Sequence, residues 1–120
     1  MHTSVLLTGD IEKVAENFLV KNFRQQLKST ILIAPHHGSK TSSEKSFAKA
    51  VSPKVVVYAT GYQNRYHFPH ANTVAVYKEA QQFNTAITGT IQFKIKGVNP
   101  NFSIFLYRKN HQRYWMSHSI

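Results

Sequence analysis

Apolar residues recur in short runs separated by amphipathic segments, and this pattern predicts alternating strands and helices. Apolar runs typical of buried strands lie within residues 4–8, 31–34 and 55–59. Helical spacing of apolar residues predicts helices over residues 11–27 and 71–83, and a segment that opens with Ser43 and Glu44 predicts a short helix over residues 43–51. In the first helix the spaced apolar residues are Val14, Phe18, Leu19, Phe23 and Leu27. The order β-α-β-α-β indicates an α/β fold with parallel strands.

The last third of the chain changes character. Alternating apolar and polar residues predict short strands over residues 86–88, 90–96 and 102–107, with turns at Gly89 and at residues 98–101. Neither a repeat nor a low-complexity linker divides the chain, and its 120 residues suit one core. We therefore expect a single domain over residues 1–120.

Two of the predicted strands end in residues that carry chemistry. The first ends in Gly9 and Asp10, and the second ends in Pro35 followed by His36 and His37. Parallel strands bring such ends to one edge of a sheet, and imidazole and carboxylate groups there bind metals or move protons. Two alternatives stay open: Asp10 caps the helix that follows it, and the histidine pair lies in a solvated loop.

The loop after the third strand is polar and aromatic. Arg65 offers a planar, bidentate donor for phosphate. Tyr62, Tyr66 and Phe68 either stack on the bases of a single strand or pack within the loop.

Charge and composition limit the partners. Fifteen Lys and Arg against five Asp and Glu give a formal net charge of +10, which favours a polyanion, nucleic acid above all, over a membrane surface or a merely solvated face. The chain has no cysteine, so any metal must be held by histidine and carboxylate. No apolar stretch approaches the ~20 residues that span a bilayer, and the first residues do not resemble a signal peptide.

Several motifs, in this order and spacing, resemble the metallo-β-lactamase-like domain of the ComEC competence DNA-internalisation family. The resemblance covers roughly residues 4 to 97 and rests on Leu6-Leu7-Thr8-Gly9-Asp10, Pro35-His36-His37-Gly38-Ser39-Lys40-Thr41-Ser42-Ser43, Asn64-Arg65-Tyr66 and Phe68-Pro69-His70. It implies the second half of an αββα sandwich. Members are inner-membrane proteins that form the channel for transforming single-stranded DNA, and their lactamase-like domain is expected to degrade the strand that is not transported.

The resemblance also implies roles for individual residues. Asp10 matches the aspartate that binds or bridges metal, and His36 or His37 matches the late histidine ligand. His36 is favoured as ligand because it lies closer to the strand end, and the remaining imidazole then either supports a ligand by donating a hydrogen bond or serves as a proton shuttle. Asp10 and His37 are the expected catalytic residues. The expected substrate-binding residues are Ser39, Thr41, Asn64, Arg65 and His70.

The chain departs from the family in one respect, because it has neither a His-x-His-x-Asp-His motif nor the His-x-Asp-x-Asp-His form. We therefore expect a C-terminal part of a longer protein, with an incomplete site for manganese or zinc and no hydrolysis by the isolated chain. The expected partners are single-stranded DNA, the upstream half of the domain, the membrane channel region and a second copy bound through surfaces that truncation exposes. The alternative is a catalytically inactive basic module that guides single-stranded DNA to a translocation channel.

Overall fold

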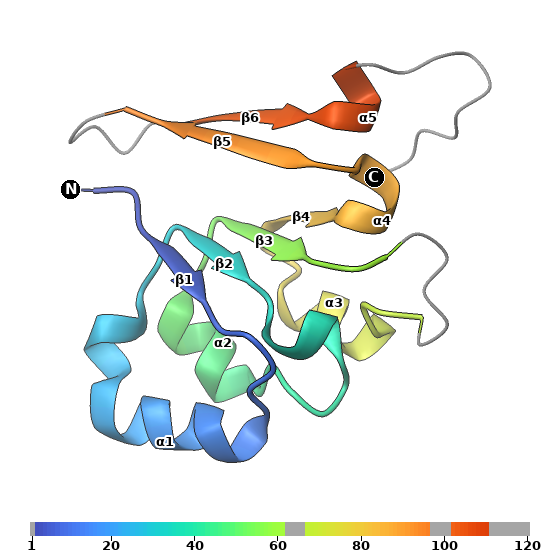
Figure 1. Cartoon of the computed structure of the whole chain (residues 1–120). Coiled ribbons are helices and arrows are strands. Elements are labelled where there is room, and N and C mark those ends of the chain that lie inside the picture. The colour runs from blue at the N-terminus through green and yellow to red at the C-terminus, as the bar shows by residue number, and fades with distance from the viewer. Residues whose placement is uncertain (1, 62–66, 97–101, 111–120) are drawn as a thin grey trace.

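A four-stranded parallel sheet forms the centre of the molecule. The computed structural model describes residues 2–61, 67–96 and 102–110. The strands lie in the order β1-β2-β3-β4, and their bounds are β1 (Val5–Leu7), β2 (Ile31–Ile33), β3 (Val55–Tyr58) and β4 (Gln81–Asn84). Strand order follows chain order, so each crossover carries a helix over the same face (Figure 1). The α/β class predicted from the sequence is confirmed.

Helices cover one face of the sheet. They are α1 (Lys13–Phe23) with the 3-10 turn η1 (Arg24–Leu27), α2 (Lys45–Val51) and α3 (Ala71–Val76). Side chains alternate between the faces of a strand, and Leu32 and Val56 point to the helices, where they pack with Phe47 and Val51 of α2. All four of these side chains are fully buried.

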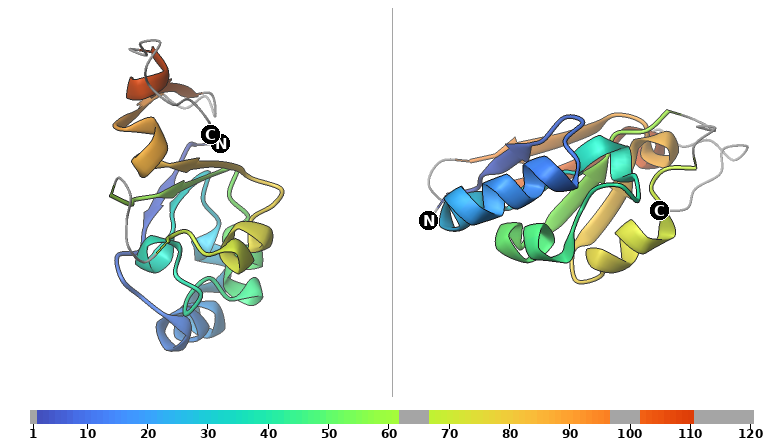
Figure 2. Two further views of the ribbon diagram at one scale, coloured as in Figure 1. Left: turned by 90° about the vertical axis from the view of Figure 1, so that its right-hand side faces the viewer. Right: turned by 90° about the horizontal axis from the view of Figure 1, so that it is seen from below.

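An antiparallel hairpin covers the other face. It is formed by β5 (Ile91–Ile95) and β6 (Phe102–Leu106), with α4 (Thr85–Thr88) before it and α5 (Tyr107–Asn110) after it. Ile31, Val55 and Val57 point to this side and form a second core with Phe83 and Leu106. The side view in Figure 2 shows the resulting layers of hairpin, sheet and helices.

Two predicted elements are wrong. The helix predicted over residues 71–83 ends at Val76, and residues 81–84 form strand β4, which pairs with β3 and buries Phe83 against the hairpin. The strand predicted over residues 86–88 is helix α4, whose first turn is capped by the Asn84 side chain accepting from Ala86 N at 2.9 Å. For β4 a tertiary contact overrides the local pattern, whereas α4 begins at a local cap that the alternating pattern does not indicate.

The first helix is shorter than predicted, and the face that it buries differs from the one that the apolar residues indicate. It begins at Lys13, and its last turn is 3-10. Val14 is 86% exposed and Phe18 59% exposed, whereas Glu16 and Val20 are buried. Within the described residues, no helix is both long and apolar enough to cross a bilayer.

Candidate functional site at the carboxyl edge of the sheet

The ends of β1 and β2 are tied together by a backbone hydrogen bond. Gly9 has a φ of +60°, a left-handed conformation that glycine adopts without a Cβ penalty, and its carbonyl accepts from His36 N at 2.9 Å. This bond brings Asp10 beside the turn that holds both histidines, η2 (Pro35–Gly38). The predicted meeting of these residues at one edge of the sheet is therefore present.

Both histidines have left-handed backbones. His36 has φ 49° and His37 has φ 57°, values uncommon for residues with a side chain. The turn is closed by Ser39 N donating to the His36 carbonyl at 2.9 Å. Such strain persists where the surroundings enforce it, and it concentrates at functional sites.

The ring of His37 contacts a backbone carbonyl through one nitrogen and faces Asp10 with the other. Its Nδ1 lies 2.6 Å from the Ala59 carbonyl oxygen, which can only accept, so Nδ1 carries the proton. Its Nε2 then faces the Asp10 carboxylate, 3.4 Å from Oδ1. Asp10 and His37 are 73% and 48% exposed, so the pair is open to a ligand.

His36 forms a second pair with a residue that the sequence did not single out. Its Nδ1 lies 3.2 Å from Glu12 Oε2 and 3.3 Å from Thr41 Oγ1, and the Thr41 hydroxyl also donates to Glu12. Glu12 precedes the first residue of α1, and no side chain caps this helix. The alternative in which Asp10 caps the helix is thus wrong, because Asp10 lies before the cap position and faces His37.

The candidate substrate residues of the turn already bond to each other. The Ser39 hydroxyl lies 2.9 Å from Thr41 Oγ1 and accepts from Thr41 N at 3.2 Å. Ser39 is buried and Thr41 is exposed. Of this pair, Thr41 is therefore the residue that a ligand can reach.

The loop after β3 reaches the histidines through Phe68. Its ring stacks on that of His37 with centroids 6.4 Å apart and lies 6.0 Å from that of His36. His70 N donates to the Gly38 carbonyl at 2.9 Å, but the His70 imidazole caps α3 by accepting from Asn72 N at 3.1 Å. The structure thus brings the backbone of His70 to the turn and its ring to a helix.

The remaining candidate residues of this loop are not placed. Asn64 and Arg65, with the aromatic Tyr62 and Tyr66, lie outside the described residues. Their predicted roles at the edge of the site stay predictions.

A buried carboxylate holds the segment between the histidine turn and α2. Glu16 is fully buried, and its two oxygens accept from Ser43 N at 2.6 Å and Glu44 N at 2.8 Å. Tyr77 donates to the Ser43 hydroxyl at 2.8 Å from the other side. Burial raises the pKa of Glu16, with the nearby Glu44 as a smaller cause in the same direction.

The site consists of two imidazole–carboxylate pairs, Asp10–His37 and Glu12–His36, whose rings lie 6.2 Å apart. Across the described parts of the chain, no three His, Cys, Asp or Glu side chains gather closely enough to hold one metal ion. The pairs offer nitrogen and oxygen donors for a cation and groups that can move a proton near neutral pH.

The fold and this edge define an α/β domain with imidazole and carboxylate groups at the carboxyl ends of parallel strands. Over most of its length the chain is related to bacterial competence proteins. It is 34% identical over 104 residues to ComE operon protein 3 of Bacillus subtilis, which covers 85% of this chain and 13% of that protein. It is 37% identical over 95 residues to Competence protein ComA of Neisseria gonorrhoeae, a match that covers 75% of this chain and 13% of that protein.

A third relative is Recombination protein 2 of Haemophilus influenzae, 36% identical over 92 residues, or 74% of this chain and 11% of that protein. The chain thus spans between 11% and 13% of the length of these relatives. No family model matches the chain, and no solved structure matches it.

Proposed function

We propose that this chain is part of a DNA-uptake protein of natural competence and contributes ligands to a metal-dependent phosphodiesterase site. Relatives named for competence, which match 85% and 75% of the chain, support the first part. The orientation of His37 supports the second. In this proposal the domain hydrolyses the DNA strand that is not transported.

The observation that carries the proposal is the pair of contacts made by His37. A metal-binding histidine commonly donates its other ring N–H to a carbonyl or carboxylate, as His37 Nδ1 does to Ala59. Two ligand atoms each about 2.1 Å from a tetrahedral ion lie roughly 3.4 Å apart. Asp10 Oδ1 and His37 Nε2 are separated by 3.4 Å, so the donors suit zinc or manganese. This geometry favours His37 over His36 as the ligand.

The side chains have separate roles in this proposal: some hold the cation and others exchange a proton or position a ring. Asp10 and His37 would hold the cation, which when bound supplies Lewis acidity that stabilises charge on phosphate oxygens and activates water. His36 is positioned by its Nδ1, which faces Glu12 Oε2, and Thr41 orients Glu12 by donating to it, so Nε2 is the His36 nitrogen left to exchange a proton with a substrate. Phe68 limits the movement of the His37 ring by stacking on it.

The further ligands of such a site would come from another part of a longer protein, since the described residues gather no third donor. We propose that the fold is half of a metallo-β-lactamase-like αββα sandwich within an inner-membrane channel protein. The surface that meets the other half would include the edge strand β1 and the exposed Val14 and Phe18 of α1.

Calorimetric titration of manganese and zinc into the chain tests the ligand assignment. We expect binding weaker than about 1 μM, that is, a binding free energy below roughly 8 kcal/mol in magnitude, because two protein ligands are fewer than the three or four of an ordinary zinc site. Asp10→Ala and His37→Ala should abolish it. His70→Ala is the matched control, because the His70 imidazole caps a helix and does not face the metal site. This variant should bind the metal as the unsubstituted chain does. Binding that survives both Asp10→Ala and His37→Ala would overturn the assignment.

The same substitutions in a longer protein that contains this chain test hydrolysis. Asp10→Ala should remove DNA degradation far more completely than His70→Ala. Equal and mild losses would contradict a metal-holding role for Asp10.

A second candidate function is that of a basic module that guides single-stranded DNA without cutting it. The net charge of +10 favours it. DNA binding that persists in a longer protein free of nuclease activity would support this candidate against the first.

A further inference from the structure

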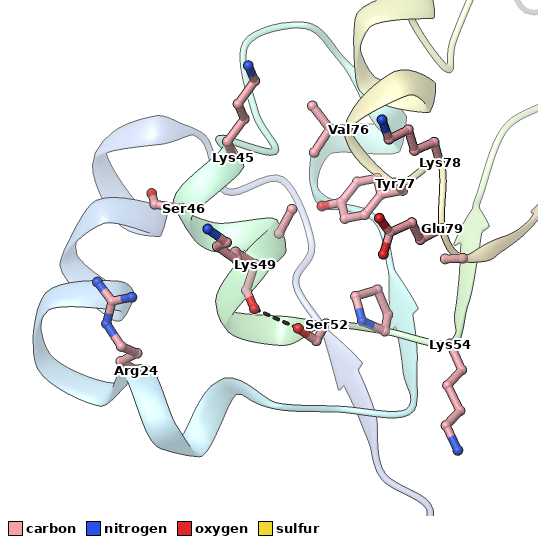
Figure 3. A pocket seen from close by; sticks show the side chains of 13 residues that line it. Arg24, Lys45, Ser46, Lys49, Ser52, Lys54, Val76, Tyr77, Lys78 and Glu79 are labelled. Carbon is pink, nitrogen blue, oxygen red and sulfur yellow. Dashed lines mark hydrogen bonds between the residues drawn. The ribbon is translucent and has the colours of Figure 1, made fainter.

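A basic cavity opens on the helical side of the molecule, away from the two histidines. It has a volume of about 770 Å³ and lies among α2, η1 and the segments that precede β3 and β4 (Figure 3). Its charged lining residues are five cations and one carboxylate: Arg24, Lys45, Lys49, Lys54, Lys78 and Glu79. Lys54 directly precedes β3, so the cavity lies toward the amino edge of the sheet, opposite Asp10 and His37.

A smaller cavity lies beside the first and is lined partly by the loop that follows the histidines. It has a volume of about 170 Å³ and shares Lys45 and Val76 with the larger one. Lys13 and Lys40 also line it, and Lys40 lies between Ser39 and Thr41 of the histidine-bearing loop. We call the cations of both cavities the basic track: Arg24, Lys45, Lys49, Lys54, Lys78, Lys13 and Lys40.

We propose that the basic track binds the phosphodiester backbone of a nucleic acid strand. The cations come from elements far apart in sequence and line two neighbouring hollows, which suits a polymer with a charge at each repeat. A lipid surface is planar and meets protruding side chains, so hollows favour a polymer. Lys13 keeps an ion pair with Glu44 at 3.7 Å, and a phosphate would compete for it.

The track contacts the backbone and not the bases. The aromatic ring among the described lining residues is Tyr77, which is only 3% exposed, and its hydroxyl is used by Ser43. It therefore offers no face for stacking. Contacts to phosphate alone position a strand without reading its sequence, so binding should be sequence-independent.

The inference deepens the second candidate function, because it names the surface that would bind the strand, and it requires no metal and no hydrolysis. Only the direction of the track, toward the Asp10–His37 pair, rests on the proposed hydrolysis. Binding is therefore measured in the presence of EDTA, so that failure of hydrolysis and failure of the track are separate results.

The test compares two triple variants by fluorescence anisotropy with a labelled oligothymidylate over a range of salt concentrations. One variant combines Lys45→Gln, Lys49→Gln and Lys78→Gln, all in the track. The matched control combines Lys28→Gln, Lys94→Gln and Lys96→Gln, which are exposed and outside both cavities. The two variants lower the net charge equally, and circular dichroism checks that both fold.

We expect the track variant to bind at least 10-fold more weakly and its salt dependence, the slope of log K against log salt, to fall by about 2, since each lost phosphate contact contributes about 0.7. The control should change both quantities much less, and an oligonucleotide of mixed sequence should behave like oligothymidylate. Equal losses in the two variants would overturn the proposal in favour of net charge alone. Loss of binding to phosphatidylglycerol vesicles with unchanged DNA binding would overturn it in favour of a lipid surface.

Discussion

At the scale of single residues, Gly38 fixes the distance between the histidine turn and the loop that follows β3. Its φ is +87°, and a Cβ built there would lie 2.6 Å from Pro69 Cβ and 2.8 Å from Tyr58 Cδ1. Only glycine fits both the conformation and the space. The contact holds Phe68, the neighbour of Pro69, against the rings of His36 and His37.

Gly38→Ala should lower the free energy of unfolding by about 3–4 kcal/mol, from the left-handed backbone and the clash together. Gly9→Ala is the control, because Gly9 also has a positive φ but a Cβ there meets no atom within 4 Å. That variant should lose only about 1 kcal/mol. Urea unfolding measures both, and equal losses would mean that the contact with Pro69 adds nothing.

Glu16 makes the free energy of unfolding depend on pH. Burial raises its pKa above the ordinary value of 4.5, so the folded chain holds this proton more tightly than the unfolded chain does. The stability contributed by Glu16 is therefore complete below 4.5 and declines as the pH rises through the raised pKa.

Glu16→Gln should remove this decline and lower stability at neutral pH by about 1–3 kcal/mol, because the amide NH₂ would face a backbone N–H where a carboxylate oxygen now accepts. Unfolding free energies of both proteins between pH 4 and pH 8 supply the comparison. A decline of the same size in the variant would assign it to other groups.

The sequence predicts which residue types meet at the site but not how they are oriented. Asp10 and the two histidines are recognisable because each follows an apolar run. The Ala59 carbonyl that orients His37 has no sequence signature, since every residue has a carbonyl. Glu12 resembles any acidic residue near a helix start. Which imidazole faces Asp10 depends on the left-handed turn, and no pattern of histidines encodes that turn.

At the scale of elements, the β5–β6 hairpin closes one face of the sheet through alternate side chains. Leu106 is 7% exposed and belongs to the second core, whereas its neighbour Phe105 is 40% exposed. Adjacent residues of one strand thus face opposite environments.

Leu106→Ala should therefore lower the free energy of unfolding by about 2–4 kcal/mol, and Phe105→Ala by less than about 1 kcal/mol. Thermal or chemical unfolding of the two variants distinguishes them. A larger loss for Phe105→Ala would mean that the hairpin packs with the other face inward.

Elements with a clear pattern of apolar residues are predictable from this sequence. Elements that form only because a neighbouring strand or hairpin packs on them are not. The β-branched run of β3 is recognisable as a buried strand, and all four of its residues are buried. Strand β4 has the sequence Gln-Gln-Phe-Asn, which lacks both alternation and β-branching. It is a strand because the free edge of β3 supplies its hydrogen bonds and the hairpin buries Phe83.

At the scale of the whole molecule, the distribution of polar and apolar surface depends on the fold. Composition gives a net charge of +10, but only the packing of α2 beside the segment before β4 places Lys49 near Lys78. In the same way, helical spacing marks Val14 and Phe18 as one stripe, but the fold leaves that stripe exposed because Glu16 and Val20 occupy the inner face.

We expect the isolated chain to self-associate through the edge strand β1. Leu7 is 75% exposed and Val5 44% exposed on this strand, which ends the sheet, and open apolar edges pair with other chains. Leu7→Lys should shift the equilibrium toward monomer in sedimentation experiments, whereas Phe105→Lys, an exposed apolar position on the hairpin, should not. A chain that is monomeric at all concentrations would contradict this expectation.

The central strands have a consequence for how the molecule opens. β2 and β3 are paired on both sides and covered on both faces, so their backbone amides can reach solvent only when the sheet itself comes apart. The histidine turn starts where β2 ends, and Ala59 directly follows β3. The two anchors of His37 therefore belong to the last unit to loosen, and fraying of β1, the helices or the hairpin leaves the ring supported.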